Sequence, residues 1–281
     1  MLKVAIIPNL NKPGTMQAAA KVLETLRGFG AVSMLSDSQE NCGLSCDRAL
    51  PEAELLAACD LVIAIGGDGT IIHTAKRAAL HDKPVLGLNT GQLGFMAGLE
   101  HDELHLLGNL IGGNYITERR MLLSARVGDG PEHHCLNDAV VSRGALSALM
   151  EIEVRDQADD VLEYRADGLI LATPTGSTAY SVSAGGPVLD PSVECILVTP
   201  ICPHSLFSRS VVFGSRSELS VATRFRQKGE AYLTIDGQDA VLLGADDVVH
   251  VRRAPDLTVK LIRMKPGSFY KVLQKKMIDR N

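Results

Sequence analysis

Apolar and polar residues alternate in blocks along the first part of the chain. Residues 61–65 form an uninterrupted apolar run, which is typical of a strand covered on both faces of a parallel sheet. Between such runs, apolar residues recur at the three- and four-residue spacing of helices. The predicted strands are 3–7, 31–35, 61–65 and 84–89, the predicted helices are 15–28, 51–58, 70–80 and 102–111, and 36–48 is expected to be a surface loop. This alternation predicts an N-terminal Rossmann-like three-layer α/β domain.

Beyond residue 114 the pattern changes to short strand-like segments separated by turn-forming residues. The expected strands are 115–127, 134–141, 149–155, 161–165, 195–199, 218–225, 231–235, 248–253 and 257–264, and a helical pattern returns at 268–277. We therefore predict a C-terminal mostly-β domain. The predicted boundaries are 1–117 with a C-terminal helix at 266–281 for the α/β domain, and 118–265 for the β-rich domain. The cleft between the domains is the expected active site.

The composition argues against several classes of protein. A chain of 281 residues with 46% hydrophobic residues can bury a sizeable core. Its net charge of −5 gives no indication of the basic patch of a nucleic-acid-binding protein. No window offers the roughly 20 apolar residues of a membrane helix, so no membrane partner is expected. Six scattered cysteines without zinc-site spacing predict reduced thiols and a cytoplasmic protein.

The apolar run 61–65 ends on Gly66-Gly67-Asp68-Gly69-Thr70, directly before a predicted helix. Backbone N–H groups in such a glycine turn and in the first turn of a helix favour phosphate. We expect the hydroxyl of Thr70 to cap the helix. A carboxylate facing phosphate is unfavourable unless Mg²⁺ bridges the two or the carboxylate accepts a proton from an attacking hydroxyl. The alternative is a tight turn in which Asp68 is an ordinary charge at a helix N-terminus.

The chain contains no P-loop, no G-x-G-x-x-G dinucleotide motif and no G-x-S-x-G nucleophile motif. A nucleotide would therefore be bound by another device. Residues 167–187 combine an acid, several Ser and Thr hydroxyls and a tyrosine around an apolar strand and a glycine turn. The uncharged hydroxyls and the backbone groups can hydrogen-bond an adenine or a ribose without charge repulsion. The alternative is a Ser/Thr-rich turn with a structural role only.

Five motifs follow one another along the chain: 66–70, 89–95, Leu136-Asn137-Asp138, 167–187 and Asp236-Gly237-Gln238. Together and in this order they resemble the motifs of the bacterial-type NAD kinases. The resemblance covers most of the chain and implies a two-domain fold that forms homodimers or homotetramers. It implies transfer of the γ-phosphoryl group of ATP to the 2′-hydroxyl of the adenosine ribose of NAD, which gives NADP. Mg²⁺ or another divalent metal would accompany ATP.

The resemblance also implies roles for individual residues. Asp68 is the implied catalytic base, and Gly67 and Gly69 belong to the turn that holds phosphate. The residues implied in NAD binding are Asn137, Asp138, Asp167, Thr178, Ala179, Tyr180 and Ser183, with Thr175, Arg165, His73 and Gln238 as further candidates. No residue is implied as a direct metal ligand.

Two other hypotheses remain at this point. One is a lipid or sugar kinase with a similar glycine motif, against which the hydroxyl-rich block 167–187 argues. The other is a non-catalytic NAD or NADP sensor. The presence of Asp68 between the glycines of the motif 66–70 argues against it. The sequence leaves open whether inorganic polyphosphate also serves as donor and whether NADH is accepted.

Overall fold

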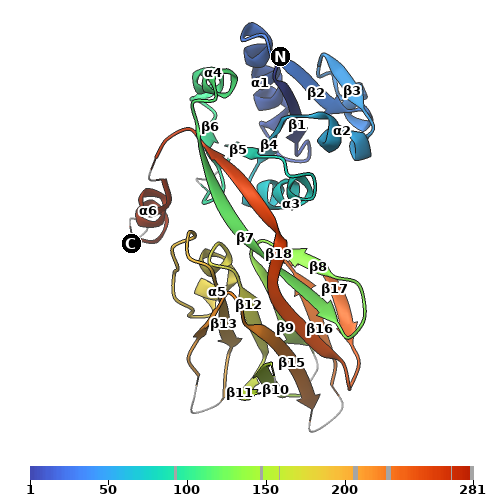
Figure 1. Cartoon of the computed structure of the whole chain (residues 1–281), viewed down its shortest axis with the longest axis vertical. Helices are drawn as coiled ribbons and strands as arrows, with labels where there is room; N and C mark the ends of the chain where they lie inside the picture. Colours follow the sequence, from blue (N-terminus) through green and yellow to red (C-terminus); the bar gives the residue numbers. More distant parts are fainter. Residues whose placement is uncertain are drawn as a thin grey trace. The chain divides into compact units, whose positions relative to one another are not determined.

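The computed structural model of the protein describes residues 1–91, 94–145, 148–157, 159–204, 208–225, 229–266 and 268–278, without the side chains of 39–41, 160, 161, 239, 268, 277 and 278. The chain divides into two compact units (Figure 1). We call Met1–Arg119 with Val259–Asn281 the α/β unit, and Arg120–Thr258 the β unit. The domain boundaries expected from the sequence stay predictions.

The α/β unit is built on a parallel sheet with the strand order β3-β2-β1-β4-β5. These strands are β1 (Lys3–Pro8), β2 (Val32–Ser36), β3 (Arg48–Leu50), β4 (Leu61–Gly66) and β5 (Val85–Asn89). The end of β18 (Val248–Arg263) continues this sheet, with Leu261 parallel to Val85. Every residue of β4 is buried, as expected for a central strand. Because the strands are parallel, the residues that follow β1, β4 and β5 meet at one edge of the sheet.

Helices cover both faces of this sheet. Helix α1 (Thr15–Gly28) buries Val22 and Leu26 in a cluster with Ile63 and Leu86. Helix α3 (Asp68–Ala79) lies on the opposite face, because its Ile71 reaches Gly87, which alternates with Leu86 along β5. The remaining elements are α2 (Glu52–Ala58), β6 (Leu99–Glu100), α4 (Gly108–Gly112), α6 (Ser268–Leu273) and the short helices η1 (Asp37–Cys42), η2 (Leu104–Leu107) and η4 (Gln274–Ile278). The expected three-layer α/β fold is confirmed.

Helix α3 begins at Asp68, two residues earlier than predicted. Gly67 already has the extended backbone of an N-cap residue (φ −94°, ψ −179°), and no side chain caps the helix. The expected cap by Thr70 is therefore wrong. The hydroxyl of Thr70 instead accepts a hydrogen bond from Asn9 Nδ2 at 3.0 Å, which ties the end of β1 to the glycine motif.

Two other predictions for the α/β unit are corrected by the structure. The segment 36–48 is not a simple loop, because it contains η1 and leads into β3, a strand too short to show alternation. The helix expected at 102–111 is interrupted and forms η2 followed by α4.

The β unit consists of two antiparallel sheets. In the first, β11-β10-β15-β18 are neighbours, and β7 and β8 continue it beyond β18; the second has the order β14-β13-β12-β9-β16-β17. The strands are β7 (Ile116–Val127), β8 (His133–Cys135), β9 (Asp138–Arg143), β10 (Met150–Asp156), β11 (Asp159–Ala166), β12 (Gly168–Ala172), β13 (Cys195–Ile201), β14 (Val211–Gly214), β15 (Glu218–Phe225), β16 (Ala231–Ile235) and β17 (Gln238–Leu243).

One buried cluster joins the two sheets of the β unit. It contains Val154 and Val221 from the first sheet and Leu171 and Val198 from the second, so the sheets pack face to face. The other face of the second sheet packs against the segment that contains η3 (Gly176–Thr178) and α5 (Tyr180–Ser183), through Ala184 and neighbours. The expected mostly-β domain is confirmed.

The strand predictions for the β unit differ from the structure in four places: two predictions have wrong bounds, and β14 and β17 were not predicted. The strand expected at 134–141 is interrupted at Leu136 and Asn137, which separate β8 from β9. The strands expected at 248–253 and 257–264 are one continuous strand, β18. Strand β17 was not predicted, although Asp236-Gly237 before it forms a two-residue hairpin turn with φ values of 49° and 69°.

No helix in the described part of the chain is long and apolar enough to cross a membrane.

The core position of β4 predicts the effect of a truncation. Ile63 is 0% exposed between the helical layers, so Ile63→Ala should lower the free energy of unfolding by about 2–5 kcal/mol through lost burial and a residual cavity. Urea unfolding measures this difference. Leu80→Ala is the control, because Leu80 is 62% exposed and its truncation should change stability by no more than about 0.5 kcal/mol. Equal losses for the two variants would contradict this packing.

Candidate active site

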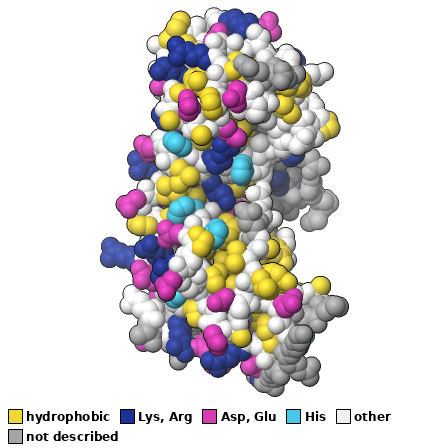
Figure 2. Space-filling model, turned by 90° about the vertical axis from the view of Figure 1, so that its right-hand side faces the viewer, with side chains coloured by type: hydrophobic (Ala, Val, Ile, Leu, Met, Phe, Trp, Pro, Cys, Tyr) yellow, Lys and Arg dark blue, Asp and Glu magenta, His cyan; other side chains and the backbone are white. Residues whose placement is uncertain are grey.

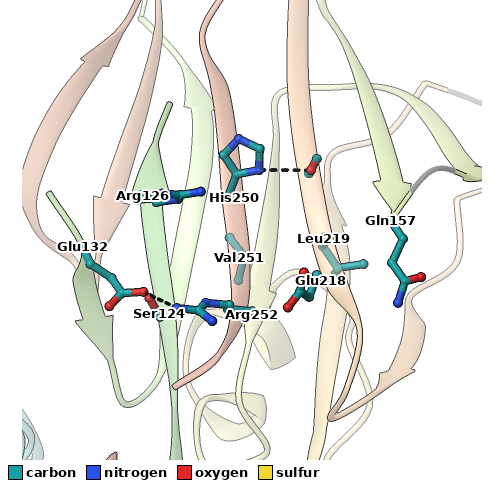
Figure 3. A pocket seen from close by; sticks show the side chains of 10 residues that line it. Ser124, Arg126, Glu132, Gln157, Glu218, Leu219, His250, Val251 and Arg252 are labelled. Carbon is teal, nitrogen blue, oxygen red and sulfur yellow. Dashed lines mark hydrogen bonds and ion pairs between the residues drawn. The ribbon is translucent and has the colours of Figure 1, made fainter. Parts of the chain in front are cut away.

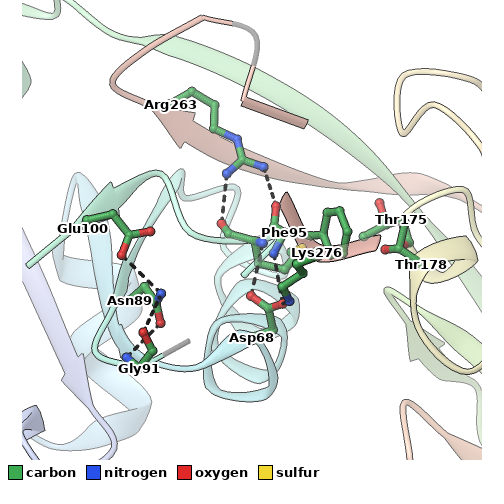
Figure 4. Close-up of polar contacts among 10 residues, drawn as sticks. Asp68, Asn89, Gly91, Phe95, Glu100, Thr175, Thr178, Arg263 and Lys276 are labelled. Atoms are coloured by element: carbon green, nitrogen blue, oxygen red, sulfur yellow. Dashed lines mark hydrogen bonds and ion pairs between the residues drawn. The ribbon is translucent and has the colours of Figure 1, made fainter. Parts of the chain in front are cut away.

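Asp68 lies at the edge of the parallel sheet, in the first turn of α3. Its carboxylate accepts hydrogen bonds from two backbone N–H groups, from Phe95 to Oδ2 at 3.0 Å and from Met96 to Oδ1 at 3.2 Å (Figure 4). The side chain remains 31% exposed. A carboxylate oxygen has two lone pairs, so each oxygen can still accept a proton from a bound hydroxyl. The site thus offers an oriented base at the end of a strand.

The loop that holds Asp68 comes from the motif 89–95. Gly94 is required there, because a Cβ at this position would lie 2.0 Å from Asp68 Oδ1. Asn89 fixes the start of the motif, since its Oδ1 accepts from the N–H of Gly91 at 3.1 Å and its Nδ2 donates to Glu100 Oε2 at 3.2 Å. Partial burial raises the pKa of Glu100. Gln92 and Leu93 of this motif lie outside the described residues.

A buried arginine binds the carbonyl groups of the loop that contains Phe95 and Met96. Arg263, the last residue of β18, is 2% exposed. Its Nη2 donates to the carbonyl of Phe95 at 3.0 Å, and its Nη1 donates to the carbonyls of Met96, at 3.2 Å, and Ala97 (Figure 4). Its Nε donates to Glu118 Oε2 at 3.0 Å. The guanidinium therefore holds the same residues whose N–H groups hold Asp68.

Sequence reasoning missed this role of Arg263. The available signal was a cationic residue at the end of the apolar strand 257–264, but the carbonyls that it binds lie more than 160 residues earlier in the chain.

In the β unit, Asp236 fixes the Asn137-Asp138 pair. Asp236 lies in the two-residue turn between β16 and β17, and its carboxylate accepts three backbone N–H groups: Leu136 at 3.1 Å, Asn137 at 2.7 Å and Asp138 at 3.2 Å. The N–H of Asp236 donates in return to the carbonyl of Asp138 at 2.9 Å. Gly176 packs against the backbone of Asn137, since a Cβ at position 176 would lie 2.1 Å from the carbonyl oxygen of Asn137.

Asp138 is a buried acid with a raised pKa. Asp138 is the first residue of β9 and is 4% exposed. Burial raises the pKa of Asp138 to about 7, and the negative charge of Asp236 contributes in the same direction. A protonated carboxyl group both donates and accepts hydrogen bonds, so Asp138 can serve two hydroxyl partners near neutral pH.

The hydroxyl-rich block 167–187 divides into two sets. Buried hydroxyls bind within the block and its neighbours: Thr173 Oγ1 donates to the carbonyl of Leu136 at 2.5 Å, and Ser177 Oγ donates to the carbonyl of Pro174 at 2.6 Å. The second set is reachable from solvent and includes Tyr180, which is 47% exposed, and Ser183. Thr178 and Ala179 are half-buried between them, and Thr175 is buried. The first set shapes the loop, and the second can contact a ligand.

The remaining predicted residues have different surroundings. Asp167 accepts a hydrogen bond from Arg143 Nε at 2.7 Å, and Arg165 pairs across the strands with Glu151 at 3.2 Å. Gln238 is exposed at the start of β17. His73 is exposed on α3 and forms no hydrogen bond or ion pair with Asp68 in the described structure. The structure thus gives Arg165 a local partner, whereas His73 and Gln238 are exposed.

A polar pocket of about 410 Å³ lies on the β unit, but no predicted site residue lines it (Figure 3). Two of its charged side chains form an ion pair, Arg252 with Glu132 at 3.1 Å, and His250 Nδ1 is 3.1 Å from the hydroxyl of Ser220. A second pocket of about 210 Å³ lies in the α/β unit and is lined by Leu88, Thr90 and residues of α1.

Charges of both signs are mixed on the face shown in Figure 2. Figure 2 shows Lys and Arg side chains interspersed with Asp and Glu on the described part of one face, which is unlike the single-sign field that attracts a polyanion. Among the described residues, no group of three or more His, Cys, Asp or Glu could hold a metal ion.

The hydrogen bonds from Arg263 to the carbonyls of Phe95, Met96 and Ala97 predict that a substitution which keeps the positive charge still lowers stability. Lysine cannot reproduce the planar fork that binds several carbonyls, so Arg263→Lys should lower the free energy of unfolding by about 2–4 kcal/mol. The amides of Phe95 and Met96 should also exchange faster with solvent, as measured by hydrogen exchange. Arg77→Lys is the control, because Arg77 pairs with Glu52 and the two side chains are 29% and 56% exposed. If these amides exchanged at the wild-type rate in Arg263→Lys, Arg263 would not be what holds the loop in place.

The raised pKa of Asp138 predicts how stability changes with pH. Between the ordinary pKa near 4 and the folded value of about 7, the native state binds more protons than the unfolded state, so stability falls as pH rises. Raising the pH from 5 to 8 should remove about 1–3 kcal/mol from the free energy of unfolding, and Asp138→Asn should flatten this part of the profile. Asp129→Asn, at an exposed turn, is the control. Identical profiles for Asp138→Asn and the wild type would exclude this assignment.

Known proteins match this chain over nearly its whole length. A curated NAD kinase of Symbiobacterium thermophilum is 42% identical over 99% of this chain and 99% of its own, and one of Geobacter sulfurreducens is 36% identical over 99% and 98%. Among solved structures, a yeast NADH kinase complexed with NADH has a TM-score of 0.88 at 24% identity, covering 100% of this chain and 88% of its own. An NAD kinase from Archaeoglobus fulgidus in complex with ATP has a TM-score of 0.75 at 23% identity, covering 98% of both chains.

The two structural matches show the fold alone, because their identities are low. The sequence matches go further. The ATP-NAD kinase N-terminal domain matches residues 4–111, and the ATP-NAD kinase C-terminal domain matches residues 136–264. These two domains in this order, together with full-length relatives of up to 42% identity among those named above, confirm the resemblance found in the motifs, and the chain belongs to the ATP-NAD kinase family.

Proposed function

We propose that the protein transfers the γ-phosphoryl group of ATP to the 2′-hydroxyl of the adenosine ribose of NAD and so forms NADP. The observation that carries this proposal is the carboxylate of Asp68, held by two backbone N–H groups within the glycine motif of a chain of this family. A carboxylate oxygen with an unused lone pair at the N-terminus of a helix suits proton transfer from a hydroxyl that attacks a phosphate.

Asp68 acts as the base. It takes the proton of the 2′-hydroxyl while the hydroxyl oxygen forms a bond to the γ-phosphorus, and the bond from that phosphorus to ADP breaks with its electron pair on ADP. The hydrogen bonds from Phe95 and Met96 orient the carboxylate before the substrate binds, which removes part of the ordering cost from the reaction. Gly67 and Gly69 allow the backbone to approach phosphate closely.

The residues fit a divalent metal that arrives with ATP. Mg²⁺ is commonly held by one or two carboxylates, substrate phosphates and waters, and no larger ligand cluster is present among the described residues. When bound, Mg²⁺ neutralises charge on the phosphate oxygens. Asp68 remains the proton acceptor, and no direct protein ligand is assigned.

The β unit binds NAD. The protonated side chain of Asp138 can donate to one ribose hydroxyl and accept from another, and Tyr180 and Ser183 are exposed for contact. The proposed NAD contacts are Asn137, Asp138, Asp167, Thr178, Ala179, Tyr180 and Ser183, with Thr175, Arg165, His73 and Gln238 as further candidates. The family resemblance also supports a homodimer or homotetramer and a cytoplasmic location.

Formation of NADP tests the proposal. The protein with MgATP and NAD should produce NADP, and parallel reactions with NADH or with polyphosphate define the acceptor and the donor. Asp68→Asn should retain NAD binding by calorimetry and lower kcat by about 10²–10⁴-fold, because it lacks the base.

Asp82→Asn is the matched control for the base. It removes the same charge from the same unit, and asparagine tolerates the left-handed backbone found there (φ 56°). Its turnover should equal that of the wild type. NADP formation by Asp68→Asn at the wild-type rate would exclude Asp68 as the base, and neither NADP nor NADPH from any substrate pair would exclude the reaction itself.

A further inference from the structure

The C-terminal segment places a lysine beside the base. Lys276, in η4, has its Nζ 3.9 Å from Asp68 Oδ2 and 4.9 Å from the centre of the Phe95 ring (Figure 4). Phe95 is the residue whose N–H donates to the same oxygen of Asp68. One loop residue therefore contacts both the base and the lysine, through its backbone and its ring.

Aromatic contacts hold this segment in place. The ring of Phe269, in α6, lies 5.8 Å from the ring of Phe95, and Tyr270 packs edge-on to Phe269 at 5.2 Å. Such pairs favour a defined orientation and contribute about 0.5–1.5 kcal/mol beyond the area that they bury. The position of Lys276 thus follows from packing that begins seven residues before it and does not depend on its attraction to Asp68 alone.

The geometry leaves the ammonium group of Lys276 able to bind another oxygen. At 3.9 Å the contact with Asp68 is longer than a hydrogen bond, so the three N–H donors of the ammonium group are not used by the carboxylate. The side chain is 29% exposed, and an approaching anion can therefore reach it. A lysine ammonium is a compact point charge suited to phosphate oxygens.

We propose that Lys276 is a catalytic residue, whose ammonium group donates a hydrogen bond to a non-bridging oxygen of the transferred phosphoryl group. This inference rests on the proposed function. The γ-phosphoryl group must approach the carboxylate of Asp68, and both are negatively charged. A cation that faces both lowers this repulsion, and most strongly where charge accumulates in the transition state. Lys276 keeps its proton throughout, since Asp68 accepts the proton of the 2′-hydroxyl and ADP carries away the electron pair.

Substitution of Lys276 separates this role from a structural one. Lys276→Met removes the charge and keeps an apolar chain over Phe95, so kcat should fall by at least about 10-fold while the KM for NAD changes by less than about 3-fold. Lys276→Arg restores the charge and should recover most of the turnover. Lys275→Met is the matched control, because Lys275 is the adjacent, exposed lysine and should keep the wild-type kcat. Thermal unfolding shows whether each variant is folded.

The outcomes distinguish this inference from the proposed function. A wild-type protein that forms no NADP overturns both. If the wild type is active and Lys276→Met keeps its kcat, Lys276 is a bystander and the inference fails alone. A higher kcat in Lys276→Met also overturns it, because the segment would then cover the base and hinder the substrate. A loss in Lys276→Met that Lys276→Arg does not recover contradicts a role for the charge.

Discussion

The hydrogen bonds from Phe95 and Met96 to the carboxylate of Asp68, together with those from Arg263 to the carbonyls of the same loop, connect three distant parts of the chain. The N–H groups of this loop face Asp68 and its carbonyls face Arg263, so the loop cannot turn without losing partners on both sides. A guanidinium left in a buried position without acceptors costs several kcal/mol. The end of β18 therefore determines the orientation of the Asp68 carboxylate, the proposed base.

The β unit also contains a carboxylate that is held by backbone N–H groups, and a second carboxylate lies beside it. Asp236 accepts three backbone N–H groups, whereas Asp138 lies beside it in a buried position, and desolvation raises its pKa to about 7. Two nearby acids with different environments can hold different charge states at one pH. One carboxylate thereby fixes the backbone of residues 136–138, and the other can present a hydroxyl group to a ligand.

The sequence predicted the parts of this structure that depend on local pattern. The apolar run 61–65 is buried on both faces, and the helix after Gly67 follows from its apolar spacing. Local pattern could also have found β17, because Asp-Gly between apolar segments is a strong hairpin signal. Local pattern could not predict the roles of Arg263 and Lys276, because these roles depend on partners more than 160 residues away. Charged residues near a chain end are indistinguishable in sequence from solvated ones.

The choice of partners around Asp68 keeps its oxygens available. An arginine paired directly with this carboxylate would occupy both oxygens in a bidentate contact and leave the base poorly placed to accept a proton. Here the buried Arg263 binds carbonyls instead, neutral N–H groups orient the carboxylate, and the only lysine in contact with it among the described residues stays at 3.9 Å. Orientation and charge are thus supplied by different groups, so Asp68 can be fixed in place and still react.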